Sequence, residues 1–329
     1  MENKITRREF NSRLGKMGLG LASVGVLPSP GWMNRKEYPA GKFVDAHHHI
    51  GKELLTGSSP FTFDPILNWM DAHSVSQTIL LSAVEHPQSY YRGRGEPVIG
   101  HDELLDLFEA TEGRLVPFCT VHQQAFDSYR EVAEVLRRFK NRGVVGFGEL
   151  KPRDRDWNAG QLPLDDPSMK RIYAACAEVG FPVLLHIDDR HAVDTPGLPA
   201  LEKVLKEFPE VIFIGHANGW WNSLSGDVKD MKGYPEGRIA PGGSAVRLLQ
   251  EYPNMYADLS ANSGLNAITR DPEFGIPFLK NHADKLLFGT DAQGGKGRDS
   301  HFEFYNLVDL PKEVTTKIFC KNTRKLLKI

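Results

Sequence analysis

The stretch FVDAHHHIG, residues 43–51, contains a short apolar run followed by three consecutive histidines. Side chains along a β-strand alternate between its two faces. A strand here would therefore place Asp45, His47 and His49 on one face and His48 on the other. This pattern predicts a pair of histidines that serve one site, with Asp45 beside them and His48 directed towards the surrounding helices.

Seven more apolar runs rich in β-branched residues follow, and amphipathic helical patterns separate them. The predicted strands are 43–47, 78–83, 115–121, 144–150, 181–187, 211–216, 255–260 and 286–291. The predicted helices include 64–75, 127–141, 166–180, 198–208 and 311–328. Most of the apolar runs are continuous, which is typical of strands buried on both faces of a parallel sheet.

Eight strand–helix units favour a parallel sheet closed into a (β/α)8 TIM barrel. A doubly wound open sheet is the alternative, but no glycine-rich phosphate-binding motif follows the first predicted strand. Residues 34–329 are therefore predicted to form a single domain. Its two long connections, 151–166 and 219–243, are expected to be functional loops.

The composition is that of a soluble globular chain. Of its 329 residues, 40% are hydrophobic and 25% are charged, and the net charge of −2 gives no reason to expect nucleic acid as a partner. The three cysteines, Cys119, Cys176 and Cys320, are widely spaced within apolar stretches. Such a sparse and odd set argues against a disulfide framework and against a thiolate zinc site.

Residues 1–33 differ from the rest of the chain. Paired arginines in TRREF, residues 6–10, precede a glycine-rich, weakly apolar run that ends at prolines. This leader resembles a twin-arginine export signal, although a basic amphipathic tail is the alternative. The run is shorter than the roughly 20 apolar residues that span a bilayer, so no stable membrane insertion is expected. We expect export to a bacterial periplasm or cell envelope. Without the leader, 35 Lys and Arg face 40 Asp and Glu, a net charge of −5.

Five of the predicted strands end in residues that can bind a metal ion. These residues are His47 and His49, Glu149, His186, His216 and Asp291. In a TIM barrel the carboxyl ends of the strands meet at one rim, where active sites lie. The sequence therefore predicts one metal site at that rim.

In these motifs the chain resembles the amidohydrolase superfamily of metal-dependent hydrolases. The H-x-H of DAHHH and the GEL, LLHID, FIGHANG and LLFGTDA segments occur in the order of the family's strand-end motifs, and IFCKNTRKLL resembles its C-terminal helix. The resemblance covers residues 43–329. It implies one metal held by His47, His49 and Asp291, and a second held by His186 and His216. Glu149 would bridge the two.

Imidazole and carboxylate ligands without thiolates suit Zn²⁺, Mn²⁺ or Fe²⁺, and Zn²⁺ is the default for such catalytic sites. The resemblance then implies that a metal-activated water cleaves an amide, ester or lactone bond of a small molecule, with Asp291 moving the proton. A mononuclear decarboxylase is the alternative, and in it His216 becomes a catalytic acid or base. A non-catalytic metal-binding protein is disfavoured, because binding alone requires no open coordination position. Members of the superfamily often form homo-oligomers.

Further residues have weaker support. Asp45 could orient one of the ligand imidazoles. Lys151 could be a carboxylated bridging lysine or, like Arg153, could contact an anionic substrate. Substrate contacts are also considered for three residues near strand ends: His122, Trp220 and Asp258. For each of these a purely structural role is the alternative. The remaining histidines, among them His191 and His301, are expected to have surface roles.

Overall fold

The protein is described by a computed structural model that covers residues 42–50, 62–81, 105–106, 108–121, 123, 126–151 and 162–329. The leader, His101, His122 and Arg153 lie outside these residues. Eight parallel strands follow one another around the sheet in chain order. They are β1 (Phe43–His49), β2 (Val75–Leu81), β3 (Leu115–Cys119), β4 (Gly146–Leu150), β6 (Val183–Asp188), β8 (Phe213–His216), β9 (Met255–Asp258) and β10 (Leu286–Leu287).

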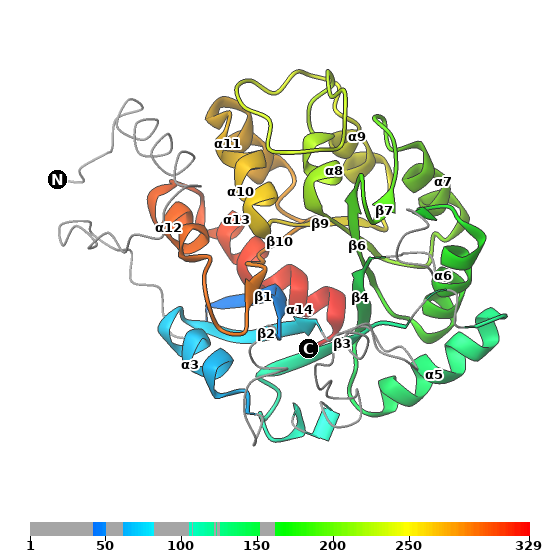
Figure 1. The fold of residues 1–329 in the computed structure, drawn as a ribbon. Coiled ribbons are helices and arrows are strands. Elements are labelled where there is room, and N and C mark those ends of the chain that lie inside the picture. Colours follow the sequence, from blue (N-terminus) through cyan, green and yellow to red (C-terminus); the bar gives the residue numbers. More distant parts are fainter. Residues whose placement is uncertain are drawn as a thin grey trace.

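The segment 286–293 joins the two ends of this sheet. At its start β10 pairs with β9, and at its end β11 (Ala292–Gln293) pairs with β1. Between them the backbone N–H of Ala46 donates to the carbonyl of Phe288 at 2.9 Å, and the N–H of Asp291 donates to the carbonyl of His47 at 2.7 Å. The predicted (β/α)8 fold is therefore confirmed. Figure 1 shows the strands gathered at the centre with helices around them.

The outer helices begin and end where the sequence provides the appropriate caps. Helix α5 (Tyr129–Asn141) starts at a capping box, in which Ser128 accepts from the N–H of Glu131 and Glu131 reaches back to Ser128. Helix α6 (Pro167–Val179) is capped by Asp166 and ends at Gly180 in the left-handed conformation. Such caps fix where the chain turns back towards the next strand.

The other helices lie between successive strands or close the chain. They are α3 (Asp64–Ala72), α7 (Pro199–Glu207), α8 (Ala217–Asn222), α9 (Ser244–Glu251), α10 (Ala261–Thr269), α11 (Pro272–Asn281), α12 (Asp299–Leu307), α13 (Lys312–Thr316) and α14 (Asn322–Leu327). The single helix predicted for 311–328 is divided, because a π-helical turn at Lys317–Lys321 joins α13 to α14. Among the described helices, none combines the length and hydropathy needed to cross a membrane.

Apolar side chains fill the barrel interior below the rim. This inner cluster comprises Ala46, Ile79, Leu81, Val116, Phe118, Leu184, Ile214, Leu287 and, from the C-terminal helix, Leu327. Val145, Ile212 and Tyr256, at the amino ends of three strands, pack against it together with Leu326 and Ile329. Helix α14 therefore covers the amino end of the barrel, and the polar residues are left for the carboxyl end.

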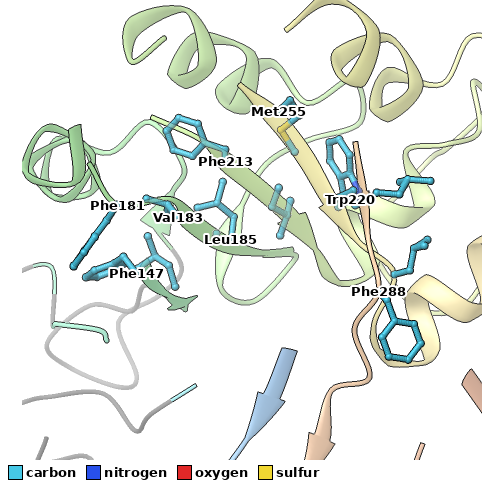
Figure 2. Close-up of a cluster of buried hydrophobic side chains, with 14 of the residues drawn as sticks. Phe147, Phe181, Val183, Leu185, Phe213, Trp220, Met255 and Phe288 are labelled. Atoms are coloured by element: carbon cyan, nitrogen blue, oxygen red, sulfur yellow. The ribbon is translucent and has the colours of Figure 1, made fainter. Parts of the chain in front are cut away.

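The opposite faces of the strands pack against the helices. Phe147, Val183, Phe213 and Met255 lie in register across four neighbouring strands (Figure 2). Gly215 belongs to the same outer face, where an added Cβ would lie only 2.5 Å from the ring of Trp220. Trp220 thus fills the space that this glycine leaves and is fully buried in the outer layer. This packing contradicts the interpretation of Trp220 as a substrate contact.

Two further sequence predictions concern the cysteines and the surface histidines. All three cysteines are described and none forms a disulfide, as the sequence predicts. His301 on α12 is buried, however, where a surface role was expected. Its Nε2 lies 3.0 Å from the carbonyl of Ala261, and its Nδ1 has no hydrogen-bond partner among the described residues. Burial, together with the charge of Arg298, lowers the pKa of His301 to about 4.

This histidine should make stability depend on pH. Between its folded pKa of about 4 and the ordinary value of 6.5, the unfolded chain binds the proton more readily. The contribution of neutral His301 is therefore complete above pH 6.5 and is lost as the pH falls towards 4, with a limiting slope of about 1.4 kcal/mol per pH unit.

Because glutamine cannot take up this proton, we expect His301→Gln to lose the part of the pH dependence of the unfolding free energy that His301 contributes. Urea unfolding of both proteins between pH 4 and 7 measures this part. The contributions of the other histidines cancel when the unfolding free energy of the variant is subtracted from that of the wild type. The difference in unfolding free energy should shrink as the pH falls. Parallel curves would contradict the prediction.

Candidate metal centre

Three side chains from the first and eighth strand positions converge at the carboxyl end of the barrel. The Nε2 atoms of His47 and His49 lie 3.3 Å apart. Oδ1 of Asp291 lies 3.2 Å from Nε2 of His49 and 3.6 Å from Nε2 of His47. Two imidazole nitrogens and a carboxylate oxygen therefore surround one point, as the ligands of a metal ion would.

Glu149 lies between this group and the histidines of β6 and β8. Its Oε2 is 3.2 Å from Nε2 of His49, whereas its Oε1 is 3.4 Å from Nε2 of His216 and contacts Nδ1 of His186. The carboxylate is buried. Each of its two oxygens thus faces a different set of histidines, which is the arrangement required of a bridging ligand.

Asp258, at the end of β9, orients two of these imidazoles. Its Oδ2 lies 2.7 Å from Nδ1 of His47, and its Oδ1 lies 3.1 Å from Nδ1 of His216. The backbone N–H of Ser260 donates to the same Oδ1 at 2.9 Å. With their Nδ1 atoms held in this way, both rings direct Nε2 towards the centre. Carboxylates commonly fix metal-binding histidines like this.

The electrostatics of the centre favour a cation. Burial alone would raise the pKa of Glu149, but Lys151 and His186 hold it well below its usual range. Burial likewise opposes ionisation of Asp291, but hydrogen bonding to His49 and the charge of His47 lower its pKa. Burial opposes the charged form of His47 too, yet Asp258 raises the pKa of His47 to about 9. Burial would also raise the pKa of Asp258, but His216 and His47 hold it well below its usual range. Three ionised carboxylates thus meet at this end of the barrel.

Local irregularities of the backbone turn the polar side chains inwards. In β4, Phe147 pairs with Val183 and Leu150 with Leu185, so one extra residue is inserted and the alternation of faces shifts between Phe147 and Leu150. Beyond the strands, Ala217, Ala261 and Asp291 have φ angles of 74°, 60° and 58°. Positive φ in residues other than glycine is uncommon and concentrates at functional sites.

The same kind of irregularity explains why Asp45 lies elsewhere than the sequence suggested. In β1, Asp45 pairs with Thr78 but His48 pairs with Leu80, so a bulge separates Asp45 from the histidines. Asp45 accepts hydrogen bonds from Thr290 and lies 3.3 Å from Nδ1 of His48. Its partner is thus the outward-facing His48, whose ring packs against Trp69. Asp45 joins the eighth strand position to the first and accepts from the backbone N–H of His47 at 3.2 Å, but its side-chain partner is the ring of His48 and not that of His47 or His49.

Lys151 forms an ion pair with Glu149, with its Nζ 2.5 Å from Oε2. Burial would favour the neutral amine, but this carboxylate raises the pKa of Lys151. The geometry therefore presents Lys151 as a charged ammonium group beside the centre. A second cation, Arg298, lies beside Asp291, with Nη2 3.3 Å from Oδ2 of that carboxylate.

Sequence reasoning overlooked three residues near the centre. Arg298 gave no signal, because it lies in a glycine-rich loop beyond the last strand. Asp188 and His191 extend the centre outwards from His186. Oδ2 of Asp188 lies 3.1 Å from Nε2 of His186 and 2.8 Å from Nδ1 of His191. The spacing H-x-D-x-x-H could have indicated them, but His191 was assigned to the surface.

The donor set fits a divalent metal. The described residues contain two groups of three ligand atoms here, His47–His49–Asp291 and His47–Glu149–His216, in each of which all atoms lie within 4.8 Å of one another. Oε2 of Glu149 is buried and faces Nζ of Lys151 at 2.5 Å and Nε2 of His49 at 3.2 Å. A buried carboxylate is costly unless cations neutralise it, and Lys151 already supplies one positive charge here.

Comparison with known families agrees with this geometry. The model of the amidohydrolase family, Amidohydro_2, matches residues 44–329. The chain belongs to this family. A search of the curated proteins finds no match.

Several solved structures share the fold at low sequence identity. An uncharacterised TIM-barrel protein from Bordetella bronchiseptica is 13% identical with a TM-score of 0.61, over 87% of this chain and 98% of that one. A probable 2-pyrone-4,6-dicarboxylic acid hydrolase from Acinetobacter baumannii is 14% identical with a TM-score of 0.55, over 88% and 100%. A dihydroxybenzoic acid decarboxylase from Polaromonas, solved with manganese and 2-nitroresorcinol, is 17% identical with a TM-score of 0.54, over 87% and 96%.

The orienting role of Asp258 can be tested directly. Asp258→Asn keeps the shape of the side chain but removes the charge that holds the two imidazoles. We expect the affinity for Zn²⁺ or Mn²⁺, measured by calorimetric titration, to fall by about 10- to 100-fold. As a control, Asp194→Asn changes a buried aspartate that accepts from the backbone of α7, so it should alter stability but not metal affinity. Unchanged affinity in a folded Asp258→Asn protein would contradict the assignment.

Proposed function

We propose that this amidohydrolase is a metal-dependent hydrolase that acts on an amide, ester or lactone bond of a small molecule. The observation that carries the proposal is the position of Glu149, whose two oxygens face two different sets of histidines. In this proposal His47, His49 and Asp291 would hold one divalent ion, His186 and His216 would hold another, and Glu149 would serve both. A mononuclear site would not require both oxygens to be presented in this way.

When bound, the metal ions polarise the substrate and make a water molecule acidic enough to react near neutral pH. The residues of the chain then have separate tasks. Asp258 and Ser260 hold the ring of His216, and Asp258 also holds His47. Asp291, kept ionised by its neighbours, can accept a proton from the attacking water and pass it to the leaving group.

We further propose that the substrate carries a carboxylate. Lys151 and Arg298 supply positive charge on two sides of the centre, next to Glu149 and Asp291. Paired cations of this kind favour anionic ligands. The names of the similar hydrolase and decarboxylase also denote carboxylic acids, which supports this choice of substrate class.

A decarboxylase with a single metal is the second candidate. It is supported by the ion pair of Lys151 with Glu149, because an ammonium group 2.5 Å from Oε2 competes with a metal for that oxygen. It is also supported by the similar decarboxylases, one of them solved with manganese. In this case His47, His49 and Asp291 would hold the metal. His216 would be available to protonate carbon.

Metal content distinguishes the two candidates. Elemental analysis after dialysis against Zn²⁺ or Mn²⁺ should give about two ions per chain for the wild type and fewer for Glu149→Gln, because the bridge is lost. Glu202→Gln is the matched control, since Glu202 accepts hydrogen bonds from Arg247 of α9 and from Tyr252, which follows that helix. One ion per chain in wild type and Glu149→Gln alike would exclude the bridged centre. The single-metal decarboxylase would then be preferred, and release of CO2 from aromatic carboxylates should be assayed.

We also propose that the protein is exported through its paired arginines. Arg7→Lys combined with Arg8→Lys should retain the protein in the cytoplasm of a bacterial host, because twin-arginine signals are read through this pair. Fractionation of periplasm and cytoplasm measures the result. Arg13→Lys is the control with the same chemical change outside the pair. Periplasmic accumulation of the double variant would contradict the proposal.

A further inference from the structure

His186, Asp188 and His191 form a third group of potential metal ligands at the outer edge of the centre. Nε2 of His186 lies 3.1 Å from Oδ2 of Asp188, and Nδ1 of His191 lies 2.8 Å from the same oxygen. All three ligand atoms lie within 4.8 Å of one another. Two imidazole nitrogens and one carboxylate oxygen are the ligand set of many three-residue zinc sites.

The turn that follows β6 holds this group in shape. Oδ1 of Asp188 accepts from the backbone N–H groups of Arg190 and His191, each at 2.7 Å. This fixes the carboxylate so that Oδ2 faces both rings. The short strand β7 (Ala192–Val193) then pairs with β6 and with β5 (Leu162–Pro163), which anchors the far end of the turn. The donors are therefore preorganised by the backbone.

This group is more accessible than the inner group His47–Glu149–His216 and about as accessible as His49 and Asp291. The side chains of His186, Asp188 and His191 are 17%, 13% and 15% exposed. Those of His47, Glu149 and His216 are at most 3% exposed, and those of His49 and Asp291 are 21% and 16% exposed. A cation from solution can thus reach the outer group and keep a water molecule as its fourth ligand. With neutral histidines, the three residues carry one negative charge, which attracts a divalent cation. Such a cation would also reduce the repulsion between Asp188 and the neighbouring carboxylates.

We propose that His186, Asp188 and His191 bind a divalent cation of the zinc type at the rim, in a site separate from the inner centre. His186 belongs to both places, because its Nδ1 contacts Glu149 while its Nε2 faces Asp188. A neutral imidazole has only one nitrogen lone pair available for a metal. A cation at the rim therefore takes His186 through Nε2, and its Nδ1–H then donates to Glu149.

The two positions consequently compete for His186. This competition rests on the proposed function, in which His186 holds the second inner metal. The existence of the rim site does not depend on the proposed function. Excess zinc would convert the centre from two inner ions to one inner ion and one at the rim. The rim site would thus act as an inhibitory zinc site.

The experiment weakens the inner centre and leaves the rim group intact. His47→Ala removes a ligand that both inner groups share, and the rim group keeps all of its residues. Equilibrium dialysis against Zn²⁺ should still load one ion per chain on His47→Ala. The double variant His47→Ala/His191→Gln should bind at least tenfold more weakly. Equal zinc binding by the two variants would overturn the proposal.

Two further measurements keep the result independent of folding and of the proposed function. His47→Ala/His282→Gln is the matched control, since His282 packs against Phe278 and belongs to none of the three ligand groups, and it should bind zinc like His47→Ala. In crystals of His47→Ala soaked in Zn²⁺, anomalous scattering should locate the ion about 2.0–2.2 Å from the ligand atoms of His186, Asp188 and His191. An ion found instead beside Glu149 and His216 would refute the rim site. That result would still be consistent with the inner metal centre of the proposed function.

Discussion

The geometry of the centre depends on the contacts that the carboxylate of Asp258 makes with two imidazole rings. One of its oxygens holds His47 of the first strand and the other holds His216 of the sixth barrel strand, at 2.7 Å and 3.1 Å. It is itself fixed by the backbone N–H of Ser260. Without this contact the two imidazoles could rotate, and their Nε2 atoms would no longer point to one place. An imidazole ring that is already fixed before a metal ion binds loses less conformational freedom on binding.

Closure of the barrel serves the same centre. The segment 286–293 bonds to β1 through the carbonyl of His47, and Asp45 accepts from Thr290 across the same junction. Asp291 therefore reaches the histidine pair because the last strand position is adjacent to the first. The apolar interior below, covered by Leu327 of α14, keeps water from the amino end of the barrel. Polar chemistry is thus confined to the carboxyl end, as in other TIM barrels.

Charge is distributed unevenly around this end of the barrel. Glu149 and Asp258 are buried at its centre beside the partly exposed Asp291, and Lys151 and Arg298 pair with Glu149 and Asp291. Asp188 and His191 extend the polar surface outwards from His186. The inner donors suit a tightly held cation and the flanking cations suit an anionic ligand. The partly exposed outer donors suit an ion that exchanges with solution.

The sequence by itself determined the order of the strands, the fold and the strand ends that carry His47, His49, Glu149, His186, His216 and Asp291. These features depend on local periodicity and on the direction of parallel strands, both of which can be read along the chain. Only the tertiary structure decided the partners. Bulges in β1 and β4 shift the alternation of faces, so period 2 misplaced Asp45. Asp258 meets His47 across 211 residues, and Trp220 is buried because Gly215 leaves room for it, which no local pattern can reveal.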